Sequence, residues 1–295
     1  MSAPGPVVPE GGSVGGARRT RLLAAVVVVV CAVTFAVLYV VFVTTRRGQL
    51  LDHAAFQGAA RGQGELWRVA QPVLDVVSEG FVVVGLVAAV VIALVRRRWS
   101  LAVQAAIVIG GSNLTTQLLK HELARSDLGI GRAANSFPSG HTTVAASVVV
   151  ALLIAAPRRW RPTIALVGAL YAAGTGVSVL VGQWHRASDA VAALVLVTLW
   201  CAVATLVGTR GSRDDVLTSE QPSSQAVERL LAAGGTVLAL LSGIGGVVLA
   251  GRLTHGAETP DQMLSAYMLG MVAVAGASCL SMATVLALRQ RATAP

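Results

Sequence analysis

The segment LLAAVVVVVCAVTFAVLYVVFVTT, residues 22–45, contains no Asp, Glu, Lys or Arg. A helix needs about 20 apolar residues to cross the hydrocarbon core of a bilayer, so this segment is long enough to span one. Six more uncharged segments of comparable length follow along the chain, at residues 99–119, 133–157, 163–184, 190–209, 230–251 and 262–288. A shorter apolar segment at residues 76–95, with Glu79 near one end, predicts an eighth span.

The composition of the whole chain indicates the same class of protein. Of its 295 residues 55% are hydrophobic and only 13% are charged, which is too apolar for a soluble globular protein. We therefore predict an all-α, polytopic transmembrane helical bundle with about eight spans. Cys31, Cys201 and Cys279 all fall inside predicted spans, so the sequence predicts no disulfide framework.

The spacing of the spans divides the chain into parts. Residues 1–21 have no periodic pattern and predict a disordered tail. Residues 22–209 hold six spans and form the main membrane domain, whereas residues 230–295 form a terminal pair of helices. The polar residues 210–229 between them predict a linker. After the first span, residues 46–75 mix apolar and polar positions in a way that suits a helix lying along the membrane interface.

The basic residues predict the orientation of the chain in the membrane. Lys and Arg in short loops stay on the cytoplasmic side, and most of the 23 basic residues share one side when both termini are placed in the cytoplasm. The net charge of +9 is then a consequence of topology in the cell membrane. The basic residues form no stripe with interleaved aromatic residues, so we expect no nucleic-acid partner. The sequence does not fix the oligomeric state.

Three groups of polar residues fall on the predicted outer side. Lys120 and Arg125 lie at the end of the third span and just after it, and the sequence PSGH at residues 138–141 begins the fourth helix. His185 and Asp189 are four residues apart at the start of the sixth span. Each group alone has an ordinary explanation, such as a snorkelling lysine, a helix cap or a surface pair. Together they provide the residue types that phosphoryl transfer requires.

Two of these groups are suited to hold a phosphate. Phosphoryl transfer needs positive charge around the equatorial oxygens of phosphorus, so Lys120 and Arg125 are expected to act as a clamp. The backbone N–H groups of Ser139 and Gly140, at the positive end of the fourth helix, are expected to add hydrogen-bond donors.

The two histidines are suited to the chemical step. A neutral His185 can attack phosphorus and form a phosphohistidine, while Asp189, one helical turn along, fixes the tautomer of its ring. His141 is expected to protonate the departing oxygen as a general acid. This chemistry requires no metal and no cofactor.

These residues resemble the motifs of the type 2 phosphatidic acid phosphatase superfamily, whose members are integral-membrane lipid phosphatases. The second motif of that family, Pro-Ser-Gly-His, is present in full at residues 138–141. Its third motif is matched at the right spacing by Ser178, His185 and Asp189, and its first begins with the equivalent of Lys120. The resemblance covers the third to sixth spans. It implies a six-helix phosphatase core, a metal-free histidine site in residues 113–189 and an opening towards the outside.

The chain departs from the family pattern at two arginines. The first motif would continue with Arg-Pro where residues 127–128 are Asp and Leu, and Arg125 is the nearest substitute. In the third motif Val179 stands where the family has an arginine beside the serine. Arg186 or Arg132 could compensate for the lost cation.

The sequence thus predicts a membrane phosphatase that hydrolyses a lipid phosphate or diphosphate through a phosphohistidine at the outer face. Because two arginines are missing, one alternative is a catalytically weakened or inactive member that binds anionic lipid headgroups or a protein partner. A transporter is a further alternative, although charged or broken helices at the bilayer midplane are largely absent from the sequence. Asn113, Thr116 and Gln117 share one face of the third span with Lys120, and they are expected either to contact substrate or to bridge helices.

Overall fold

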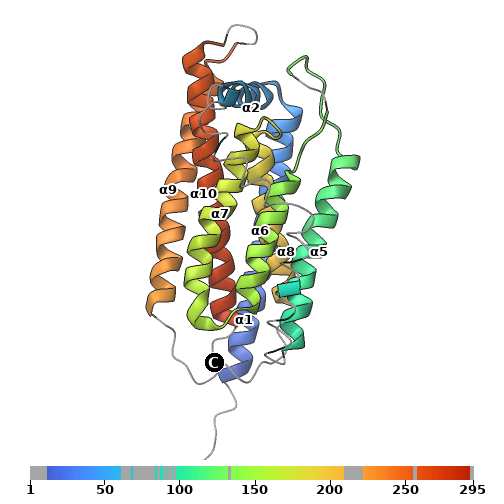
Figure 1. The fold of residues 1–295 in the computed structure, drawn as a ribbon, viewed down its shortest axis with the longest axis vertical. Coiled ribbons are helices and arrows are strands. Elements are labelled where there is room, and N and C mark those ends of the chain that lie inside the picture. The colour runs from blue at the N-terminus through green and yellow to red at the C-terminus, as the bar shows by residue number, and fades with distance from the viewer. Residues whose placement is uncertain are drawn as a thin grey trace, which may run out of the picture.

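The computed structural model describes residues 12–60, 98–131, 134–208, 222–254 and 258–292, together with the single positions 68, 84, 87, 88, 91 and 95. The described residues form helices and no strands. Their order is α1 (Gly12–Tyr39), the π-helical turn η1 (Val40–Thr44), α2 (Arg46–Ala59), α5 (Trp99–Glu122), α6 (Gly140–Ala155), the 3-10 turn η3 (Arg158–Trp160), α7 (Arg161–Val181), α8 (Ala187–Gly208), α9 (Pro222–Ala250) and α10 (Pro260–Ala292). Most of these helices run side by side along the long axis of the molecule (Figure 1).

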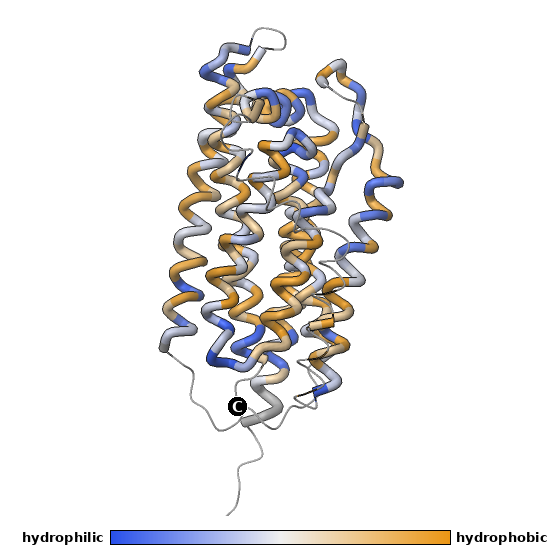
Figure 2. The backbone as a smooth tube through the Cα atoms, viewed as in Figure 1, coloured by the Kyte–Doolittle hydropathy of each residue, from blue (hydrophilic) through white to orange (hydrophobic). Residues whose placement is uncertain are grey.

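The helices have the length and composition of an integral membrane protein. Five described segments are long and apolar enough to cross a bilayer, namely residues 16–44, 158–181, 187–208, 223–250 and 260–292. Hydrophobic residues occupy the middle of the bundle and hydrophilic residues gather towards its two ends (Figure 2). The helices α5 and α6 run alongside in the same bundle (Figure 1), although α6 has only 16 residues. The predicted span at residues 76–95 lies outside the described residues, apart from single positions.

Two helices begin at positions that the sequence alone did not indicate. The first helix begins at Gly12, so residues 12–21, which we expected in a disordered tail, are helical where the structure describes them. Likewise α9 begins at Pro222 inside the expected linker, because proline is well tolerated in the first turn of a helix. The fourth helix, by contrast, begins at Gly140 within the PSGH sequence, as predicted.

The helix α2 lies across one end of the bundle rather than along it (Figure 1). The chain breaks at Thr45, whose extended backbone and side-chain hydroxyl cap α2 by accepting from the Gly48 N–H at 3.2 Å. The buried residues of α2 include the polar Gln49 and Asp52. An interfacial helix was expected in this segment, and α2 occupies its first half.

The two ends of the bundle carry different groups. At one end the Thr20 hydroxyl of α1 donates to the Arg291 carbonyl of α10 at 3.0 Å, which brings the beginning of α1 to the end of α10. At the other end α2, the start of α6 and the start of α8 meet: the Ser188 N–H contacts Asp52, and the Ser139 N–H contacts the Asp189 carbonyl. The motif residues therefore gather at the end of the bundle opposite to the start of α1 and the end of α10.

Candidate active site

The PSGH sequence forms the turn that begins α6. Ser139 has an extended backbone, and its hydroxyl accepts from the Thr142 N–H at 3.4 Å, so it is the N-cap of the helix. The Ser139 N–H donates to the Asp189 carbonyl at 2.9 Å. This bond ties the second motif directly to α8. It also corrects one expectation, because this N–H is paired within the protein and is not offered to a phosphate.

His185 and Asp189 form the pair that their spacing predicted. The Nδ1 atom of His185 lies 3.2 Å from Asp189 Oδ2, and the Asp189 side chain is fully buried. A carboxylate only accepts hydrogen bonds, so Nδ1 carries the proton in this contact. The Nε2 atom is then unprotonated in the neutral ring, as a nucleophile requires.

Two further donors hold the same carboxylate oxygen. The Ser136 hydroxyl donates to Asp189 Oδ2 at 2.7 Å, and the Arg186 backbone N–H donates to it at 3.0 Å. The second contact is half of a capping box, in which the third helical residue reaches back to the N-cap N–H. Asp189 Oδ1 is buried and has no hydrogen-bond partner among the described residues. The sequence did not single out Ser136, although it immediately precedes the PSGH turn.

His141 faces His185 across the site. Their ring centroids are 6.4 Å apart at an interplanar angle of 65°, and the His141 ring also lies 5.2 Å from that of Trp184. The charge of Lys120 acts on His141 as well. A Cβ atom placed on Gly140 would lie 3.3 Å from Lys120 Nζ, so the ammonium group sits directly beside the first turn of α6. The structure therefore brings Lys120, Gly140 and both histidines together.

Arg125 is placed differently from Lys120. Its Nη2 lies 3.5 Å from the Phe42 carbonyl, and its Nε and Nη1 are buried with no hydrogen-bond partner among the described residues. Burial, followed by the positive charge of Arg186, lowers the pKa of this guanidinium, while Asp52 and Asp189 oppose the shift. Within the described part of the chain, no hydrogen bond joins Arg125 to Lys120 or to either histidine.

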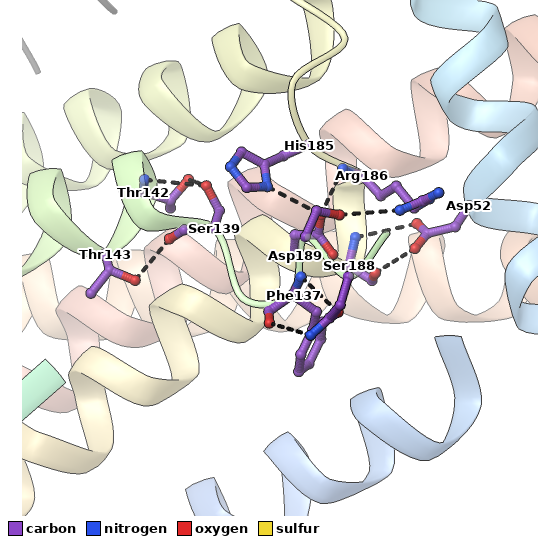
Figure 3. Close-up of polar contacts among 11 residues, drawn as sticks. Asp52, Phe137, Ser139, Thr142, Thr143, His185, Arg186, Ser188 and Asp189 are labelled. Carbon is purple, nitrogen blue, oxygen red and sulfur yellow. Dashed lines mark hydrogen bonds and ion pairs between the residues drawn. The ribbon is translucent and has the colours of Figure 1, made fainter. Parts of the chain in front are cut away.

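Arg186 and Arg132 were the two residues expected to compensate for the missing arginine, and the structure describes only Arg186. The Arg186 guanidinium donates from Nη1 to the Ser136 hydroxyl at 3.1 Å. It extends from Asp189 towards Asp52, away from the ring of His185 (Figure 3). Arg132 lies outside the described residues. At the position of the family arginine, buried Val179 instead accepts the His185 N–H on its carbonyl at 3.1 Å.

The polar face of the third span mainly bridges helices. Asn113 donates to the Ser147 hydroxyl at 3.1 Å, and the hydroxyls of Thr116 and Thr143 are 3.0 Å apart. These contacts join α5 to α6. They favour the helix-bridging explanation for Asn113 and Thr116 over substrate contact.

Asp52 of α2 is a buried carboxylate that the sequence analysis missed. Its Oδ1 accepts from the Ser188 N–H at 3.3 Å, and its Oδ2 forms a short hydrogen bond with the Ser188 hydroxyl. Burial, followed by the charge of Asp189, raises the pKa of this carboxyl to about 6. The available signal in the sequence was an acidic residue among the mostly small or apolar residues of a short helix.

A cavity of about 520 Å³ lies on the Asp52 side of α8. It is lined by residues of α1, η1, α2, α8, α9 and α10, most of them apolar, and Asp52 and Ser188 also contribute to its wall. Lys120, His141 and His185 do not line it. The histidines and this cavity therefore lie on different sides of α8.

Comparisons with known proteins give a consistent result. Residues 101–212 match the model of the PAP2 superfamily. The structure also resembles the crystal structure of the first transmembrane PAP2 type phosphatidylglycerolphosphate phosphatase from Bacillus subtilis, with a TM-score of 0.54 and 22% sequence identity. This match covers 63% of the present chain and 98% of the other, and at this identity it shows a shared fold. No curated protein sequence matches the chain.

Proposed function

We propose that this chain, whose residues 101–212 match the model of the PAP2 superfamily, hydrolyses a lipid phosphate or diphosphate through a phosphohistidine on His185. The family match and the transmembrane phosphatase fold support a membrane phosphatase in general. One observation supports the specific mechanism. The ring centroids of His141 and His185 lie 6.4 Å apart, and the Asp189 carboxylate contacts Nδ1 of His185. A phosphorus atom between the two rings is within reach of both.

The first chemical step forms one bond and breaks another. His185 Nε2 attacks phosphorus, an N–P bond forms, and the P–O bond to the lipid alcohol or lipid phosphate breaks. His141 delivers a proton to the departing oxygen. As positive charge develops on the His185 ring, the Asp189 carboxylate stabilises it through Nδ1–H. In the second step neutral His141 takes a proton from water as the water oxygen attacks phosphorus. The N–P bond then breaks, inorganic phosphate is released, and both histidines return to their starting states.

The phosphate oxygens need positive charge and donors on the same side as the histidines. Lys120 Nζ lies beside Gly140, and the N–H groups of Gly140 and His141 in the first turn of α6 have no carbonyl partner within the helix. These groups form the phosphate-binding surface that the geometry supports best. Arg125, predicted as the second cation, would add two unused guanidinium nitrogens if it turned towards the phosphate. None of these groups requires a metal or a cofactor.

The substrate is proposed to enter from the outer leaflet. The distribution of basic residues favours a cytoplasmic location for both termini, and the motif residues lie at the end of the bundle opposite to the start of α1 and the end of α10. A cysteine introduced at the exposed Asp127 should react with a membrane-impermeant thiol reagent on intact cells. Protection of that cysteine until the cells are opened would place the site on the inner side.

Release of inorganic phosphate tests the proposed activity. Purified protein is supplied with phosphatidate, phosphatidylglycerol phosphate and a polyprenyl diphosphate in mixed micelles, with and without EDTA. Hydrolysis of at least one of them should persist in EDTA and fall at least about 10⁴-fold in His185→Ala, as expected for loss of a nucleophile. Unchanged release by His185→Ala would exclude the mechanism. Binding of these lipids without release would favour the inactive, lipid-binding alternative.

A further inference from the structure

The amino end of α8 lacks a capping side chain of its own. The residue before Ala187, the first of α8, is Arg186, and an arginine side chain has no hydrogen-bond acceptor. The first N–H groups of a helix need acceptors from elsewhere. Asp189 accepts the Arg186 N–H from within the helix, and Asp52 accepts the Ser188 N–H from α2. Asp52 thus supplies the acceptor for the Ser188 N–H from outside α8, as Asp189 does for the Arg186 N–H from within it.

The same carboxylate also faces the side chain of Arg186. The positive charge of Arg186 acts on Asp52, and its guanidinium extends towards Asp52 in Figure 3. In that position Arg186 Nη1 donates to the Ser136 hydroxyl, which in turn donates to Asp189 Oδ2. Hydrogen bonds therefore lead from Arg186 through Ser136 to the carboxylate that orients His185, and Asp52 interacts with Arg186 through its charge.

Asp189 retains an acceptor that a displaced arginine could take. Its Oδ1 is buried and has no hydrogen-bond partner among the described residues. A guanidinium binds a carboxylate through two parallel hydrogen bonds, and such pairs are strong when desolvated. Without a counter-charge on the Asp52 side, Arg186 would be drawn to Asp189 and would compete with His185 for it.

We propose that Asp52 is a positioning residue for the reaction: it fixes the start of α8 through Ser188 and keeps the Arg186 guanidinium away from Asp189, so that the Asp189 carboxylate remains committed to His185. This inference rests on the proposed function. Asp52 lies outside residues 101–212, which match the family model, so this contribution comes from α2. The carboxyl, with a pKa of about 6, is mainly ionised at neutral pH, as its role requires. The charged groups acting on it are Asp189 and Arg186, and it acts in turn on Arg125.

A suppressor experiment separates positioning from a structural role. Asp52→Ala, Arg186→Gln and the double variant are assayed on the lipid that the wild-type protein hydrolyses. Asp52→Ala should lower kcat about 10- to 100-fold with less than about a threefold change in KM, since a misplaced catalytic group can cost up to about 100-fold. The double variant should recover most of the kcat that Asp52→Ala loses, because no guanidinium is left to capture Asp189, while the remaining loss reflects the missing acceptor for Ser188. Asp127→Ala, which removes an exposed carboxylate of the 123–139 loop, is the matched control and should leave kcat unchanged.

A measurement independent of turnover distinguishes failure of this inference from failure of the proposed function. The ¹⁵N chemical shifts of the His185 ring report whether Nδ1–H remains bonded to Asp189. They should change in Asp52→Ala and return in the double variant, even if no lipid tested is hydrolysed. Unchanged shifts in Asp52→Ala would overturn the inference. So would a double variant whose loss of kcat equals the product of the two single losses.

Discussion

Two clusters of polar side chains lie on either side of Asp189, one around the histidines and one around two arginines. Their cations look alike in the sequence, but the two clusters differ in charge balance in the structure. On one side Lys120, His141 and His185 lie close together, and among the described residues the carboxylate whose charge acts on Lys120 is that of Asp189. On the other side Asp52 and two arginines, Arg125 and Arg186, lie buried together with both signs of charge present. A cation that no protein carboxylate neutralises is available to pair with the anion of a substrate. The histidine side, which consists of Lys120, His141 and His185, is therefore suited to bind substrate. The arginine side, which consists of Asp52, Arg125 and Arg186, is suited to hold Asp189 in place.

After His185→Ala, the largest loss of activity among the substitutions on the two sides should follow replacement of His141. His141→Ala should lower kcat for a lipid phosphate by about 10² to 10⁴-fold, because the departing alkoxide then leaves without a proton donor. The loss should shrink for a synthetic substrate with an acidic leaving group, such as a nitrophenyl phosphate. Equal losses on both substrates would show that His141 is not the acid.

The two candidate cations provide the next comparison. Lys120→Ala should lower kcat/KM by about 10² to 10³-fold, the usual cost of losing a donor to transition-state charge. Arg125→Ala should cost less than about tenfold, because its contacts lie on the arginine side. Both variants are compared in phosphate release from the same lipid. Losses of equal size would instead place Arg125 on the phosphate, as the sequence alone predicted.

The smallest effect concerns stability on the arginine side. In the folded protein the Asp52 carboxyl has a pKa of about 6, raised from an ordinary value of 3.8, so the folded state binds this proton more tightly than the unfolded chain. Its contribution to stability is therefore greatest at low pH and is lost as the pH rises through about 6. Melting temperatures in detergent should fall between pH 5 and 7 for the wild-type protein. Asp52→Asn should flatten that part of the profile, and an unchanged slope would contradict the raised pKa.

The sequence alone was sufficient for the fold class and for much of the histidine side. Uncharged segments of spanning length identified the bundle, since backbone groups in lipid must be paired within helices. The spacing of His185 and Asp189 is one helical turn, so their contact followed from local geometry. The PSGH turn likewise contained its own cap in Ser139. Contacts between residues that are close in the sequence can therefore be predicted from a motif alone.

The arginine side could not be predicted because its contacts join distant segments. Asp52 and Ser188 are 136 positions apart, and the contact between Arg186 and Ser136 joins two loops 50 positions apart. Arg125 was assigned to the phosphate because it lies near the family position in sequence, yet its loop turns it towards Phe42 and the Asp52 side. The hydrogen bond from the Ser139 N–H to the Asp189 carbonyl could not be predicted either, because it also joins segments that are distant in the sequence.

Chemical trapping of the intermediate tests the central claim most directly. The protein is mixed with a lipid phosphate labelled at phosphorus, quenched in alkali within milliseconds and analysed peptide by peptide, with His185→Ala as the control. The account predicts an acid-labile, alkali-stable phosphoryl group on the peptide that contains His185, and its absence from the control. Full hydrolysis with no labelled peptide, or label on His141 instead, would contradict it.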